Sequence, residues 1–359
     1  MTTIDQIALQ CYGKSGMFPI SFCLPRQKIR PFRAKEKEKE LSFIIPGVSG
    51  TFVFTDEESY MNEYQTSKFA RTKKKGGWDC VRHLEIMAAS SLPLFEDIGS
   101  CPEYTMIHYP KHLFSAINES FGEMSDSDYN RMQEQIYTWL TEHLASNRMV
   151  DYLLRMSDNL GAKNILFIDK SLPLKPDCES AMILGGLKNK FGATCEVAYP
   201  LECLYSGKPV PSKPKWWKTN FNIYGILDDT LRSPNEKRCN LNTIIANIRS
   251  KAYDVIIYGS MSRSLALFRL AAEYYPKKRI ICINGDDDNM LGAPKRPTFF
   301  KGVKAMLREG ARRDRKYEGF PAVPFSDNHS RWKNLSAAIM PHCTLFMREL
   351  ALRPDVAAK

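Results

Sequence analysis

Strands that alternate with helices fill the second half of the chain, and this alternation limits the fold more than any other feature of the sequence. Short apolar runs there are separated by amphipathic segments, and the runs cover 164–168, 194–199, 254–258 and 279–284. Near-continuous apolar strands are typical of a parallel sheet that helices cover on both faces. Such sheets bind ligands beyond the carboxyl ends of their strands, so candidate site positions follow Ile168, Tyr258 and Asn284.

The first half of the chain is less regular, and its predicted elements are shorter. Apolar runs beside turn residues predict strands over 42–45, 51–54 and 91–95. Apolar residues at helical spacing predict helices over 55–69, 79–89 and 126–160. The charged run 33–40 predicts a solvated loop. We therefore expect two α/β domains, 1–150 and 151–359, and the second ends in a helical tail over 300–359.

The charge of the chain restricts its partners. Lys and Arg number 51 against 40 Asp and Glu, so the formal net charge is +11. This excess suits a phosphate-bearing ligand, a nucleic acid or an anionic membrane face, and an ordinary basic surface accounts for it equally well. The sequence has no apolar run long enough to span a bilayer and no secretory signal at its start. We therefore expect a cytoplasmic protein with reduced cysteines.

The densest group of candidate binding residues lies where lysines precede a double glycine and a helix: Lys74, Lys75, Gly76, Gly77, Arg82 and Glu85. Glycines let a diphosphate approach the backbone closely, and the N–H groups of a helix start favour anions. Arg82 can fork onto phosphate, and Glu85, three residues later on the same helix face, can accept from sugar or ribose hydroxyls. A capped amphipathic helix with a surface Arg–Glu pair is the simpler alternative.

A family resemblance rests on this segment and its neighbours. An aromatic and serine segment at 60–69 precedes the Gly-rich turn and helix at 74–85, and a small-residue turn and strand follow at 88–95. Together these stretches resemble the donor-binding half of exostosin-like glycosyltransferases of the GT-B fold. Residues 101–111 continue the similarity toward uncharacterised microbial and large-virus glycosyltransferase-like proteins. The resemblance implies that Arg82 and Glu85 contact a nucleotide-sugar donor.

The resemblance also implies a fold of two Rossmann-like halves of GT-B type. Two departures from the family pattern stand out. The small-residue turn contains Ser90-Ser91 where Gly-Cys is usual. The donor-like half precedes the more complete α/β half, whereas ordinary GT-B enzymes have the reverse order. This order fits a permuted chain, a part of a larger protein or a degenerate enzyme.

Candidate catalytic residues lie beside the Gly-Gly turn and after the predicted strand 279–284. The candidates for a general base on the acceptor hydroxyl are Asp79, His83 and Asp287, and the sequence does not decide between them. Lys111 adds a cation for the departing diphosphate. Asp286 and Asp288 could hold a divalent cation, but an acidic loop at a strand end is the preferred interpretation, and GT-B enzymes generally need no metal.

These observations predict a glycosyltransferase that moves a sugar from a nucleotide-sugar donor to a hydroxyl of a glycan or glycoconjugate, without a cofactor. The alternative is a binding protein, either a degenerate transferase-like scaffold or a basic nucleotide- or nucleic-acid-binding protein. A nucleic-acid binder should show a steep salt dependence for polynucleotides. A transferase should prefer one nucleoside diphosphate. The two halves would face each other within one chain or across a homodimer.

Overall fold

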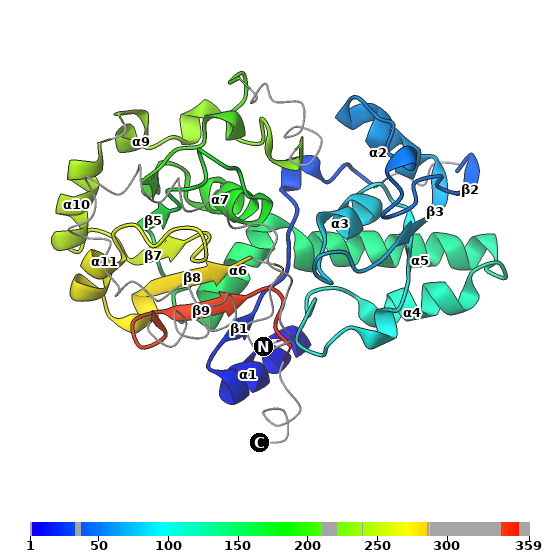
Figure 1. The fold of residues 1–359 in the computed structure, drawn as a ribbon, viewed down its shortest axis with the longest axis horizontal. Helices are drawn as coiled ribbons and strands as arrows, with labels where there is room; N and C mark the ends of the chain where they lie inside the picture. Colours follow the sequence, from blue (N-terminus) through cyan, green and yellow to red (C-terminus); the bar gives the residue numbers. More distant parts are fainter. Residues whose placement is uncertain are drawn as a thin grey trace.

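Two parallel β-sheets organise the protein (Figure 1). The structure is a computed structural model, and it describes residues 2–32, 37–209, 221–238, 240–285, 287 and 339–351. The larger sheet has six strands in the order β1-β9-β8-β7-β5-β6, and the smaller has three in the order β2-β3-β4. This confirms the predicted α/β class with two Rossmann-like parallel sheets.

The six-stranded sheet is parallel at every pairing. Its strands are β1 (Phe18–Pro19), β5 (Ile165–Ile168), β6 (Cys195–Val197), β7 (Val255–Tyr258), β8 (Ile280–Asn284) and β9 (Thr344–Met347). The apolar runs of the second half thus form the strands that the sequence predicts. Successive side chains point to opposite faces, so Ile165 and Phe167 join one core cluster while Leu166 and Ile168 join another.

Helices cover both faces of this sheet. They are α1 (Thr3–Ser15), α6 (Ser146–Met156), α7 (Cys178–Phe191), α9 (Pro234–Arg238), α10 (Leu241–Arg249) and α11 (Phe268–Tyr274). Helices α6 and α7 approach closely because Gly186 has no side chain, and a Cβ atom there would lie 2.5 Å from the Ser146 carbonyl oxygen. Among the described helices, none combines the length and the apolar character that a membrane crossing requires.

The smaller sheet carries its own helices, at the right of Figure 1. Its strands are β2 (Lys39–Leu41), β3 (Ser67–Thr72) and β4 (Leu92–Phe95). Its helices are α2 (Glu57–Gln65), α3 (Val81–Ala88), α4 (Lys111–Ser120) and α5 (Asp126–Trp139). Phe69 packs toward α4 and α5, and Ala70 packs toward α2 and α3. The sheet is therefore also covered on both faces.

Several predictions for the first half are wrong. Residues 67–69, predicted as the end of a helix, begin β3, because α2 ends at Gln65 and the side chains that follow alternate between the two cores. Residues 39 and 40 of the predicted solvated run form β2 together with Leu41. Residues 51–54 form no strand, and the 3₁₀ turn Ser49–Thr51 lies there instead. In the predicted helical tail, residues 344–347 form β9, and most of the remaining tail lies outside the described residues.

The chain crosses between the two sheets twice, and the crossings lie side by side. After β1 it leaves the large sheet, builds the small one, and returns through a π-helical turn at Leu140–Leu144. The Leu24 N–H donates to the Leu144 carbonyl oxygen at 2.8 Å, and the Ser146 N–H donates to the Leu24 carbonyl oxygen at 2.9 Å. Backbone hydrogen bonds thus tie the outgoing and returning segments together.

Candidate functional site

The loops that follow strands β3, β8 and β9 meet at the junction of the two halves. Asp79, beyond the end of β3, contacts Arg348 and Glu349, which directly follow β9. Gly285, directly after β8, contacts Arg348 as well. The carboxyl ends of the strands of both sheets therefore border one shared region, which is where parallel sheets place their ligands.

Arg348 lies at the centre of this junction, with 1% of its surface exposed. Its Nη1 donates to the Asp79 carbonyl oxygen at 2.7 Å, and its Nε donates to the Gly285 carbonyl oxygen at 2.9 Å. Carboxylates also surround the guanidinium group within 3.4 Å, those of Asp287, Glu179 and Glu349. Burial lowers the pKa of Arg348, but the carboxylates around it prevail and raise that pKa above its ordinary value. A charged arginine therefore joins the halves.

The Gly76-Gly77 turn packs directly against two of these carboxylates. A Cβ atom at Gly76 would overlap the Asp287 carboxylate, and one at Gly77 would overlap that of Glu349. The Asp79 N–H donates to the same Glu349 group at 2.9 Å. The double glycine thus permits a close approach to the backbone, as the sequence predicts of such a turn. In this structure, carboxylates of the chain itself occupy the space.

Asp79 is buried between both halves. Its Oδ2 accepts from the Phe22 N–H at 2.6 Å, and its Oδ1 accepts from the Tyr109 hydroxyl at 2.7 Å. Burial raises the pKa of Asp79 to about 7, against the opposing effect of Arg348 and the two hydrogen bonds, while Glu349 adds to the rise. A carboxyl group that titrates near neutrality is suited to proton transfer, but both of its oxygens are already hydrogen-bonded here.

Asp79→Asn should gain stability relative to the parent chain as pH rises. The folded pKa of about 7 exceeds the ordinary value of 3.8, so the contribution of Asp79 is full below about pH 4 and is lost as pH rises to about 7. The amide loses no proton. Its oxygen can accept from the Phe22 N–H, and its Nδ2 can donate to the Tyr109 hydroxyl oxygen in a reversed hydrogen bond. Between pH 4 and 8, the unfolding free energy of the variant should therefore rise by on the order of 2–4 kcal/mol relative to that of the parent chain. Urea unfolding across this range measures it, and a constant difference would contradict the prediction.

His83 is fully buried in α3, and both of its ring nitrogens have partners. Nδ1 lies 2.8 Å from the Thr72 hydroxyl, and Nε2 lies 2.9 Å from the Trp78 carbonyl oxygen. Because a carbonyl can only accept, Nε2 carries the proton and Nδ1 accepts from Thr72. Burial lowers the pKa of His83 to about 3, so the ring is neutral. In this arrangement His83 fixes the turn before α3 and offers no unoccupied nitrogen to a substrate.

Arg82 and Glu85 face the tyrosines of α2. Glu85 is buried, and its oxygens accept from the Tyr60 hydroxyl at 2.6 Å and from Asn222 Nδ2 at 2.5 Å. Burial raises the pKa of Glu85, and these hydrogen bonds and Arg82 oppose the rise. The Arg82 Nη1 atom is buried and has no hydrogen-bond partner among the described residues. Asn222 belongs to the larger half, so this group also spans the junction.

The predicted lysines have different surroundings. Lys74 and Lys75 are exposed, and Lys74 Nζ lies 5.1 Å from the centre of the Trp78 ring. Lys111 Nζ instead donates to three carbonyl oxygens at 2.7–3.1 Å, those of Pro102, Glu103 and Thr105. Burial lowers the pKa of Lys111. Its contacts hold the turn before α4 together, whereas Lys74 and Lys75 are accessible to a ligand.

The acidic loop after β8 is only partly described. Asp287 forms an ion pair with Arg348, and Asp286 and Asp288 lie outside the described residues. Sequence reasoning missed Arg348, Glu349 and Asn222. The sequence does carry a pattern that could have identified Arg348 and Glu349. They directly follow the apolar run 344–347, just as Asp169 follows β5, and residues in that position lie at the carboxyl end of a strand. No local pattern marks Asn222.

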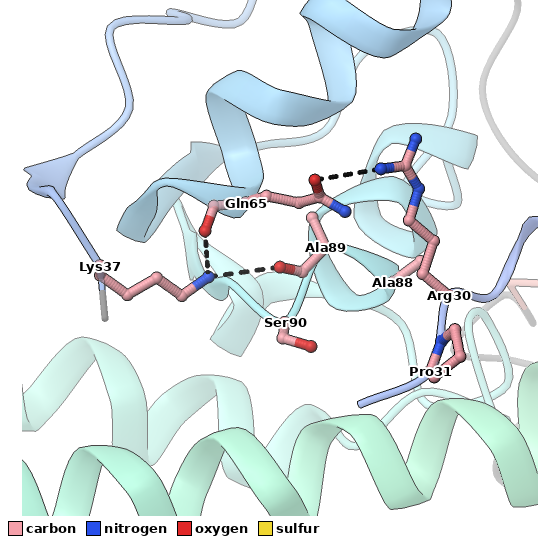
Figure 2. A pocket seen from close by; sticks show the side chains of 7 residues that line it. All are labelled: Arg30, Pro31, Lys37, Gln65, Ala88, Ala89 and Ser90. Carbon is pink, nitrogen blue, oxygen red and sulfur yellow. Dashed lines mark hydrogen bonds between the residues drawn. The ribbon is translucent and has the colours of Figure 1, made fainter. Parts of the chain in front are cut away.

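A cavity of about 250 Å³ lies at the far end of α3 from Arg82 (Figure 2). Its lining comprises Arg30, Pro31, Lys37, Gln65, Ala88, Ala89 and Ser90. Lys37 Nζ donates to the carbonyl oxygens of Gln65 at 2.8 Å and Ala89 at 3.3 Å, and Arg30 donates to the Gln65 side chain at 3.1 Å. The two Lys37 bonds satisfy main-chain carbonyl groups at the ends of α2 and α3. Ser90, at the turn that departs from the family pattern, thus lines a cavity remote from Arg82.

Similarity to known proteins does not identify the function of this site. No protein-family model, no curated protein and no solved structure matches this chain. The similarity to exostosin-like glycosyltransferases therefore stays a prediction from the motif residues themselves.

Proposed function

We propose that the chain transfers a sugar from a nucleotide-sugar donor to an acceptor hydroxyl, with the donor diphosphate at Arg82. The observation that carries this proposal is the buried Arg82 Nη1, which has no hydrogen-bond partner among the described residues. Burying a cationic donor without a partner costs free energy, and a phosphate oxygen would remove that cost. Arg82 also lies in the first turn of α3, where main-chain N–H groups favour an anion.

The residues around Arg82 suit the remaining parts of a donor. Glu85 is held by Tyr60 and Asn222, and each carboxylate oxygen keeps a further lone pair for a ribose or sugar hydroxyl. The exposed Lys74 and Lys75 add positive charge beside the Gly-Gly turn. Cations and helix-start N–H groups stabilise a departing diphosphate without a metal. Burial raises the pKa of the candidate base Asp79 to about 7, whereas it lowers the pKa of His83 to about 3.

A second candidate function is a nucleotide-binding scaffold without transferase activity. The observation that favours it is the occupation of the Gly-Gly turn by the carboxylates of Asp287 and Glu349. His83 and Lys111 are likewise committed to contacts within the chain. An active donor site would require the carboxylates to move when a diphosphate binds, whereas a scaffold would retain them.

Thermal stabilisation by nucleoside diphosphates and nucleotide sugars tests the donor site. A ligand that binds only the folded chain adds about 2.7 kcal/mol at one hundred times its dissociation constant. We expect one nucleoside diphosphate to raise the melting temperature without magnesium. Arg82→Ala should weaken its binding by about 100-fold, because a charge-assisted bidentate contact is lost. Arg71→Ala, an exposed position on β3, is the matched control and should bind as the parent does.

The outcomes separate the hypotheses. A selective shift that Arg82→Ala removes supports the donor site, and release of the nucleoside diphosphate on adding acceptors then distinguishes a transferase from a scaffold. If no nucleotide raises the melting temperature, the donor-site proposal is wrong. Stabilisation by polynucleotides instead, with affinity that falls steeply with salt, would identify a nucleic-acid binder.

A further inference from the structure

One loop concentrates exposed apolar side chains. We call residues 43–53, between β2 and α2, the apolar loop. Its exposed members are Phe43 at 46%, Ile45 at 44%, Val48 at 50% and Val53 at 64%. The other exposed large apolar side chains of the described chain are scattered, at Leu9, Phe121, Leu160 and Leu174. Scattered apolar residues are normal on a surface, whereas a cluster marks an interaction site.

Hydrogen bonds hold the apolar loop in this shape. The Thr51 hydroxyl oxygen accepts from the Ile45 N–H at 3.0 Å, and the hydroxyl lies 2.8 Å from the Val48 carbonyl oxygen. The Phe43 N–H donates to the buried Glu63 carboxylate at 3.0 Å, and the Phe43 ring stacks on Phe54 at 5.7 Å. The folded backbone therefore presents these side chains to solvent in a defined arrangement.

Two lysines lie close to residues of the apolar loop. Lys39 Nζ is 5.7 Å from the centre of the Phe43 ring. Lys73 Cε would lie 4.0 Å from a Cβ atom at Gly47, and the exposed Lys74 and Lys75 follow it. Carboxylates pair with some of this charge, since Glu63 binds Lys39 and Glu96 binds Lys73. Asp56, Glu57 and Glu58 begin α2 close by in sequence, and Glu57 is paired with Lys28.

We propose that the apolar loop and its flanking lysines dock on the surface of an anionic lipid bilayer. Ile45, Val48 and Val53 would enter the interface between headgroups and acyl chains, and Lys39 and Lys73 would face anionic headgroups. Stable peripheral binding needs two such signals, because a small apolar insertion alone is marginal. Charge complementarity favours a bilayer over a protein partner, since lysines are depleted from protein interfaces and attracted to anionic lipid. The net charge of +11 acts in the same direction.

Co-sedimentation of the full chain with vesicles tests this proposal. We expect binding to phosphatidylcholine vesicles that contain phosphatidylserine, little binding to pure phosphatidylcholine, and a decline as salt is added. Val48→Asp with Val53→Asp should weaken binding at least ten-fold, because two apolar contacts become charged. Leu160→Asp with Leu174→Asp is the matched control at 57% and 69% exposure in the larger half, and it should bind normally.

Substitution of a lysine tests the electrostatic contribution to membrane binding separately. Lys73→Gln should weaken binding to the anionic vesicles about five-fold and leave the residual binding to neutral vesicles unchanged. The bilayer proposal is overturned if the parent chain does not bind anionic vesicles at low salt, or if the valine variant binds as well as the control. It is also overturned if sedimentation shows self-association that the valine variant abolishes, because a second copy would then cover the loop. None of these outcomes depends on nucleotide binding.

Discussion

Arg348→Met is expected to destabilise the folded chain by about 3–5 kcal/mol, because removing one partner from a buried charged network leaves the others uncompensated. The guanidinium group holds carbonyl oxygens of Asp79 and Gly285, and it balances the carboxylates of Glu179, Asp287 and Glu349. Methionine fills a similar volume, so the loss would report charge and hydrogen bonding more than packing. The methionine also removes the hydrogen bond from Nη1 to the Asp79 carbonyl oxygen, which joins the two halves.

Urea unfolding at pH 7 measures this effect, followed by tryptophan fluorescence. Arg131→Met is the matched control, because Arg131 is 67% exposed, pairs only with Asp128 among the described contacts, and should change stability by less than about 1 kcal/mol. Arg348→Lys keeps the charge but cannot fork onto two groups, so it should fall between the parent and the methionine variant. Equal unfolding midpoints for Arg348→Met and the control would show that the network contributes no net stability.

Lys188→Met should destabilise the folded chain by a comparable amount, about 3–5 kcal/mol, because it also removes one partner from a buried charged network. Lys188 is fully buried in α7, and its Nζ donates to the Cys195 and Leu231 carbonyl oxygens at 2.6 and 3.1 Å. It also pairs at 2.5 Å with Glu236, whose carboxylate binds the Tyr205 hydroxyl. Without the lysine, that carboxylate would be a buried charge beside two unsatisfied carbonyl groups.

A second substitution identifies the cause of the loss. Lys188→Met combined with Glu236→Gln removes the uncompensated charge, so the double variant should be more stable than Lys188→Met alone. Lys190→Met serves as the control on the same helix, since Lys190 is 33% exposed and its ion pair with Asp151 is solvated. If the double variant proves as unstable as the single one, cavity formation rather than charge would explain the effect.

Strands β5, β7 and β8 of the larger sheet were predictable because burial on both faces leaves an unbroken apolar run. Strand β9 was not predicted, since the tail that contains it was expected to be helical. Strands β2 and β3 were not predictable, because each combines polar and apolar residues without a clear alternation. Lys39–Leu41 gains strand pairing from β3 rather than from its own composition. Ser67–Thr72 combines polar and apolar residues that each fill a specific place between two layers of helices. Tertiary packing, not local preference, decides both strands.

The candidate site was predictable to a similar extent. Arg82 and Glu85 lie on the helix that the spacing predicts, and the Gly-Gly turn precedes it. The partners of these residues come from distant parts of the chain, and no local pattern encodes them. Asn222 reaches Glu85 across 137 residues, and Arg348 reaches Asp79 across 269. A residue that acts through such a contact has no signature within its own segment.

The position of β1 bears on how the chain is made. Phe18 pairs with Phe346 at the edge of the large sheet, and β9 is the only described strand that β1 touches. On the ribosome, Phe18 emerges long before its partner Phe346, whereas Phe69 and Leu92 of the small sheet can pair soon after both emerge. Such distant pairings are slow to form. Strand β1 therefore gains its strand partner only after β9 has been translated, and until then its apolar residues are open to chaperones.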